Sequence, residues 1–183
     1  MPYHVCDVRV AAFPDETTVS KALAAYSTSI EEFRSAVAQF ICPVERTVLG
    51  GYQQHLARHL EQYLVAFLLA KPNVSRASRQ YSSLLGEQAD LAVSSGGASN
   101  LYVEIEFRPN VEKDLAKFQI GHNAGRLGIG ILVLAISRWR LNPSYTTMPE
   151  FEKFNRVIPE FKPLHPLLLV GIDGEHRLAT GGD

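Results

Sequence analysis

The sequence predicts an α/β fold in which a central mixed sheet of about five strands is flanked by helices on both sides. Three observations indicate this class. Residues 17–40 and 52–69 carry apolar side chains at steps of three and four, as an amphipathic helix does. Residues 128–136 form a continuous apolar run, which is typical of a strand covered on both faces. That run follows a helical stretch that itself follows a strand, which is the order of a crossover between parallel strands.

Composition fits one domain over residues 1–183. With 46% hydrophobic and 20% charged residues, the chain can bury a core without covalent staples. A net charge of −1 excludes a polyelectrolyte, so any binding of nucleic acid must depend on a local patch. Cys6 and Cys42 lie among apolar residues and are too few for a disulfide framework, so we expect reduced thiols and a cytoplasmic protein. No apolar run reaches the ~18 residues of a membrane helix, so we expect no membrane contact.

The first half of the chain predicts a strand and two helices. Residues 3–13 alternate as a strand does and end at Pro14. Thr17 or Thr18 then caps a helix that runs to about residue 40 and is stopped by Pro43. A second helix covers residues 52–69. Residues 73–86, which are rich in serine and arginine, are expected to form a loop.

The second half predicts four further strands and two helices. Residues 88–93 and 100–108 read as a hairpin joined by a turn of serine and glycine. A helix follows over residues 110–126, then the apolar strand 128–136. A loop at 143–147, a helix at 149–161 and a strand at 166–172 lead to a polar tail. The predicted order is β-α-α-β-β-α-β-α-β, with no internal repeat.

One strand combines apolar and acidic residues in strict alternation. In residues 101–107, leucine, valine, isoleucine and phenylalanine share one face, which leaves Tyr102, Glu104 and Glu106 on the other. The two glutamates then lie about 7 Å apart. The predicted hairpin brings a third acid, Asp90, to the same place. Three carboxylates so gathered predict a site for one divalent cation or for a pair of cations.

Each of these features also has a simpler explanation. A Glu-Ile-Glu strand is more commonly the solvated face of an edge strand. Lys113 and Lys117, one turn apart on the following helix, taken alone suit an exposed face on which neighbouring acids are their partners. The combination of the acids, the glycine turn, the basic helix and the apolar strand favours the site.

The layout of Asp90, Glu104-Ile-Glu106 and the lysine-bearing helix resembles the PD-(D/E)xK nuclease superfamily, with Glu-x-Glu in place of Glu-x-Lys. Within it, residues 107–119 resemble the BamHI/BglII-like type II restriction endonucleases, in which an acid pair runs into Phe-Gly-Asn and a basic helix. The similarity is best over residues 88–136. The chain departs from that pattern at Arg108-Pro109, and it is short, so loops that read bases are expected to be reduced.

The resemblance implies a restriction-endonuclease-like fold and hydrolysis of double-stranded DNA by a homodimer with Mg²⁺, for which Mn²⁺ can substitute. Asp90 and Glu104 would be metal ligands, and Glu106 a ligand, a base for the attacking water or a replacement for the lysine of most relatives. Either Lys113 or Lys117, but not both, would supply the positive charge. Glu61, on the second helix, is a candidate further acid.

The charge distribution supports a DNA-binding face beside these acids. Residues 107–140 contain six basic and two acidic residues, whereas the remainder has an excess of acids. Two rival functions remain open. One is a nuclease of the same fold that acts in repair, transposition or cleavage of DNA junctions, and the other is a DNA-binding or interaction module without catalysis.

Overall fold

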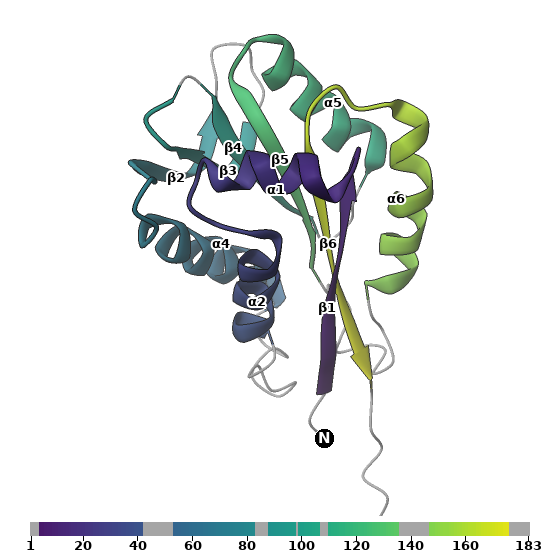
Figure 1. Cartoon of the computed structure of the whole chain (residues 1–183). Helices are drawn as coiled ribbons and strands as arrows, with labels where there is room; N and C mark the ends of the chain where they lie inside the picture. The colour runs from purple at the N-terminus through teal and green to yellow at the C-terminus, as the bar shows by residue number, and fades with distance from the viewer. Residues whose placement is uncertain are drawn as a thin grey trace, which may run out of the picture.

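A computed structural model of the chain describes residues 4–41, 53–82, 88–97, 99–106, 110–135 and 147–175. Its centre is one sheet of six strands in the order β1-β6-β5-β4-β3-β2 (Figure 1). Strands β6, β5 and β4 are parallel to one another, and β1, β3 and β2 pair antiparallel to their neighbours. The elements are β1 (His4–Phe13), α1 (Glu16–Ala24), α2 (Ile30–Ile41), α4 (Gln53–Leu69), β2 (Arg76–Ser82), β3 (Gln88–Ser94), β4 (Asn100–Glu106), α5 (Val111–Asn123), β5 (Leu127–Leu134), α6 (Met148–Phe161) and β6 (Leu167–Glu175).

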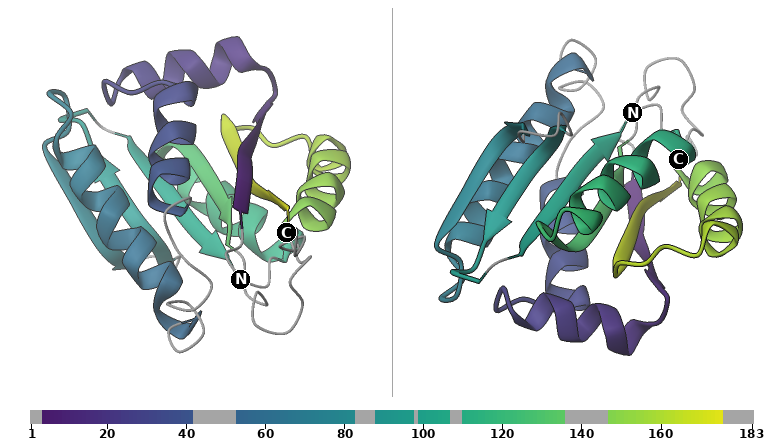
Figure 2. Two further views of the ribbon diagram at one scale, coloured as in Figure 1. Left: turned by 90° about the horizontal axis from the view of Figure 1, so that it is seen from below. Right: turned by 90° about the horizontal axis from the view of Figure 1, so that it is seen from above.

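The sheet is the middle of three layers. Helices α1, α2 and α4 pack on one face and α5 and α6 on the other, as the two views of Figure 2 show. The first face holds the larger apolar core, to which β4 contributes Leu101, Val103 and Ile105. The other core contains Tyr102 of β4 together with Phe118 of α5. The predicted α/β class, with a mixed sheet between helices, is confirmed.

The single helix predicted over residues 17–40 is wrong, because it is two helices. Helix α1 ends at Ala24, and Ser27 adopts a left-handed backbone conformation with φ of 52°, which an α-helix cannot contain. Helix α2 restarts with a reciprocal cap, since the Ser29 hydroxyl accepts from the backbone N–H of Glu32 and the Glu32 carboxylate accepts from that of Ser29. Apolar residues recur at helical spacing on both sides of the break, so the sequence pattern alone does not reveal it.

The loop predicted at residues 73–86 is also wrong in part. Residues 76–82 form β2, which pairs antiparallel with β3 and is the sixth strand. An edge strand has one neighbour and tolerates polar and charged residues, so the segment lacks the apolar alternation that marks a strand in sequence. The sheet therefore has six strands, not about five.

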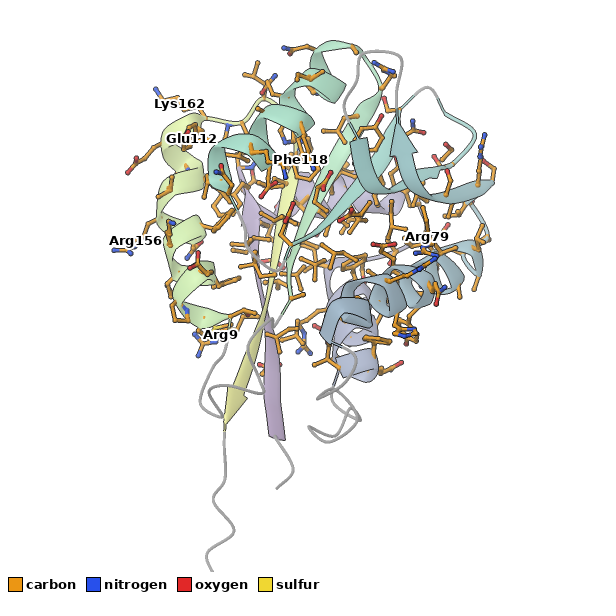
Figure 3. The ribbon with its side chains drawn as sticks, turned by 180° about the vertical axis from the view of Figure 1, so that it is seen from behind. Arg9, Arg79, Glu112, Phe118, Arg156 and Lys162 are labelled. Atoms are coloured by element: carbon orange, nitrogen blue, oxygen red, sulfur yellow. The ribbon has the colours of Figure 1, made fainter. Side chains whose placement is uncertain are left out.

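Strands β4 and β5 carry the crossover that positions the site. They pair in parallel, and α5 connects them, as predicted. A side chain at Gly130 of β5 would meet the ring of Phe118 at 2.9 Å, so this glycine lets α5 lie close to the sheet. Phe118 points from α5 toward the strands in Figure 3. The predicted boundaries of this helix extend three residues too far, because the chain turns at Gly125 with φ of 70°.

Several expectations fall outside the described residues. The structure does not describe Cys42, the side chain of Cys6, the segment Arg108-Pro109, or the basic residues Arg138 and Arg140. None of the described helices is both long and apolar enough to cross a bilayer.

Candidate active site

The hairpin of β3 and β4 brings Asp90 beside the acids of β4, as predicted. The two strands pair from Leu91 opposite Val103 to Ser94 opposite Asn100. The described pairing of the two strands ends at Leu91. One residue earlier, the Asp90 carboxylate accepts a hydrogen bond from the backbone N–H of Ile105 at 2.7 Å. Asp90 is thus tied to the main chain between Glu104 and Glu106.

Glu104 is not on a solvated face. Strand β4 lies inside the sheet, and Glu104 is 1% exposed, so the explanation of this strand as a solvated edge is wrong. One carboxylate oxygen, Oε2, accepts a hydrogen bond from Nζ of Lys117 at 2.8 Å. The other, Oε1, is buried and has no hydrogen-bond partner among the described residues.

Both lysines of α5 reach an acid of β4. Lys117 pairs with Glu104, and Nζ of Lys113 lies 3.7 Å from Oε1 of Glu106. Four residues of helix rise about 6 Å and two residues of strand about 6.6 Å, so the lysine spacing on α5 matches the glutamate spacing on β4. The expectation that only one lysine can face the acids is therefore wrong. Lys117 is the more enclosed, since its side chain is 23% exposed against 60% for Lys113.

Burial and mutual repulsion disfavour ionisation of these acids. Burial raises the pKa of Glu104 to about 7; Lys117 opposes this rise, and the nearby charges of Asp90 and Glu106 add to it. Burial also raises the pKa of Asp90, although its hydrogen bond from Ile105 acts in the other direction. Burial acts to lower the pKa of Lys117, but the carboxylates of Glu104, Glu106 and Asp114 act more strongly and raise it overall. A further cation at the acids would relieve the repulsion.

Glu61 is a buried acid of α4 whose charge interacts with that of Asp90. It is 7% exposed, and its Oε2 accepts a hydrogen bond from Nε of Arg79 at 2.9 Å and forms an ion pair with Nη2 of the same side chain, also at 2.9 Å. Figure 3 places Arg79 over α4, reaching from β2. Burial raises the pKa of Glu61, the hydrogen bond from Arg79 opposes this rise, and the charge of Asp90 adds to it. Sequence reasoning missed Arg79 because its strand was taken for a loop.

Asp114 is a fourth carboxylate near the lysines, and sequence reasoning missed it as well. It is fully buried on α5, where the prediction gave it only a partner role on an exposed face. Burial and the charge of Glu106 raise its pKa to about 6. Its spacing could have revealed it, since Asp114 stands three residues after Val111 and four before Phe118, on the buried stripe of the helix.

The carboxylate groups of this site are chemically suited to bind a hard divalent cation. Carboxylate oxygens are the ligands that Mg²⁺ prefers, and Oε1 of Glu104 is a buried oxygen without a hydrogen-bond partner among the described residues. A bound cation would favour the ionised form of the buried carboxylates Asp90, Glu104 and Asp114, whose pKa values are raised without it. In their present positions, no three His, Cys, Asp or Glu side chains of the described ranges are arranged to hold a metal.

The fold, a mixed sheet between two helical layers with the β4-α5-β5 crossover at its centre, is that of restriction-endonuclease-like proteins. Comparison with known protein families identifies the family within this fold. The family model of restriction endonuclease BglII/BglIII matches residues 13–172, a range that includes all the acids and both lysines. No curated protein matches the chain. The chain belongs to the BglII/BglIII family of PD-(D/E)xK type II restriction endonucleases, so its class is that of an endonuclease that hydrolyses DNA.

Proposed function

We propose that this chain is a Mg²⁺-dependent type II restriction enzyme that hydrolyses phosphodiester bonds of double-stranded DNA as a homodimer in the cytoplasm. The observation that carries the proposal is the buried pair of Glu104 and Lys117 beside Asp90. A buried carboxylate with one free oxygen and a raised pKa is costly to the fold, and such costs gather where chemistry is done.

Asp90 and Glu104 are the proposed metal ligands, with the backbone carbonyl of Ile105 as a further oxygen and Glu61 as an outlying acid. A divalent cation bound there would supply charge for the phosphorane-like transition state and lower the pKa of a bound water. Mn²⁺ has similar ligand preferences and is expected to substitute.

Lys117 and Glu106 have distinct proposed roles. Lys117 is held close to the reacting region by Glu104, and its ammonium group can neutralise negative charge that develops on the phosphate. Glu106 is 19% exposed, so it can contact water, and it either binds the cation or accepts the proton of the attacking water. Lys113 is the more exposed ammonium group and is suited to contact the DNA backbone.

The homodimer is proposed because cleavage of both strands requires two active sites, and a two-fold arrangement of protein matches the symmetry of a palindromic site. Sedimentation of the chain with and without a DNA duplex tests this part. A complex containing two chains per duplex supports the proposal, and a single chain per duplex contradicts it.

A plasmid digest with Mg²⁺ distinguishes the proposed enzyme from its rivals. Discrete bands of fixed size support restriction cleavage, whereas a smear or cutting only at junctions indicates a nuclease with another task. Calorimetry with Mn²⁺ addresses the non-catalytic alternative. Heat of binding that disappears in Asp90→Ala supports the site, and DNA affinity that is indifferent to metal, with no metal binding, favours a binding module.

A further inference from the structure

Asp114 occupies a position on α5 that an apolar residue would fill at less cost. It belongs to the buried stripe of the helix with Val111, Leu115, Phe118 and Gly121, and it is 0% exposed. Burying a carboxylate without full compensation is unfavourable, so a buried acid calls for an explanation. The neighbours of Asp114 supply one.

Only part of the carboxylate is engaged in holding the helix. Oδ2 accepts from the backbone N–H of Asn110, the N-cap of α5, at 3.3 Å. That distance is long for such a bond. Oδ1 is buried and has no hydrogen-bond partner among the described residues. An amide side chain of the same size could accept this hydrogen bond, so the bond alone does not require a charge, although the N-terminus of α5 favours one.

The charge of Asp114 acts on the site instead. It attracts both lysines of α5 and repels Glu106. On a helix, Asp114 lies about 60° around the axis from Lys117 and next to it, on the side that faces the sheet. A negative charge in this place favours a position of the Lys117 ammonium group against the sheet, where it pairs with Glu104 at 2.8 Å, over a position extended into solvent.

We propose that Asp114 is a positioning residue of the active site, whose buried carboxylate holds the Lys117 ammonium group against Glu104 and steadies the first turn of α5 beside Glu106. The proposal rests on the proposed function for its effect on cleavage. Its effect on Lys117 is independent of that function. Because Asp114 is fully buried, the proposal gives it no contact with DNA or with the reacting atoms.

Two substitutions separate positioning from helix capping. Asp114→Asn removes the charge and keeps an oxygen for the Asn110 N–H, whereas Asp114→Ala removes both. Glu112→Gln is the matched control, because it removes a neighbouring exposed acid of the same helix turn. Positioning predicts that both Asp114 variants lose at least 10-fold in kcat, with KM for DNA within 3-fold of wild type and with Asp114→Asn melting at or above the wild-type temperature. Cleavage by Asp114→Asn at the wild-type rate overturns the proposal.

Side-chain reactivity gives a readout that does not depend on cleavage. Amidination of the full-length protein, followed by mass spectrometry of its peptides, measures the accessibility of each lysine. We expect Lys117 to react at least 3-fold faster in Asp114→Asn than in the wild type, and at an unchanged rate in Glu112→Gln. An unchanged Lys117 rate in Asp114→Asn refutes the positioning role even if activity falls. If the wild type cuts no DNA, the proposed function fails, and this rate still decides the role of Asp114.

Discussion

Replacing Glu104 with glutamine should stabilise the metal-free protein at alkaline pH while it abolishes cleavage. Glutamine has the shape of the protonated glutamate, and its amide oxygen can still accept from Lys117. The substitution therefore removes the buried charge and changes little else. Because Glu104 is 1% exposed, its ionisation is not relieved by solvent.

The size of the effect follows from the pKa of Glu104, which rises from its ordinary value of 4.5 to about 7 in the folded protein, chiefly through burial. Below pH 4.5 the group is neutral in both states and costs nothing. As the pH rises through 4.5 the unfolded chain ionises first, and the folded protein loses stability until the pH passes about 7. At about 1.36 kcal/mol for each pH unit between these values, the loss approaches about 3 kcal/mol.

Urea unfolding followed by circular dichroism, with EDTA present, measures this difference. The free energy of unfolding of Glu104→Gln should exceed that of the wild type by about 3 kcal/mol at pH 8 and by less than about 1 kcal/mol at pH 5. The other buried acids titrate in both proteins, so the comparison measures the charge of Glu104 together with its repulsion from Asp90 and Glu106. An equal difference at both pH values, or a variant that is less stable at pH 8, would refute the assignment of a raised pKa to Glu104.

Three further substitutions test the surroundings of the acids. Lys117→Met should lower plasmid cleavage at pH 7.5 at least 100-fold (about 3 kcal/mol in the barrier), and Lys113→Met only about 10-fold because that side chain is mostly exposed; equal effects would contradict the distinction. Arg79→Met should reduce the free energy of unfolding at pH 7 by about 2 kcal/mol, since it leaves Glu61 buried without its partner, and wild-type stability would contradict the pairing. Gly130→Ala should lower the free energy of unfolding by about 1–3 kcal/mol, because the added methyl group crowds the ring of Phe118. An unchanged melting temperature would show that α5 moves to make room for that methyl group.

The sequence predicted the parts of the fold that depend on burial. Strand β5 is apolar throughout because both of its faces are covered, and the crossover through α5 follows from its place in the chain. The break between α1 and α2 escaped prediction because a local conformation at Ser27 determines it, while the apolar spacing continues across. Strand β2 escaped because an edge strand needs no apolar alternation.

The site was predictable where it depends on strand alternation and poorly predictable where it depends on tertiary contact. The common face of Glu104 and Glu106 follows from the period of a strand, and the approach of Asp90 follows from the hairpin. The pairing of Arg79 with Glu61 joins residues 18 apart in sequence on a helix and a strand, and no local pattern indicates it. The burial of Asp114 could have been inferred from helix spacing, but its charge suggested an exposed position.

Metal-dependent cleavage by the acids of β4 is the central claim, and a plasmid digest with a double substitution tests it most directly. The wild type in Mg²⁺ should give discrete bands, and Glu104→Ala combined with Glu106→Ala should leave the plasmid intact under the same conditions, as should the wild type in EDTA. Circular dichroism of the double variant establishes that it is folded. The same discrete bands from a folded double variant would contradict the account.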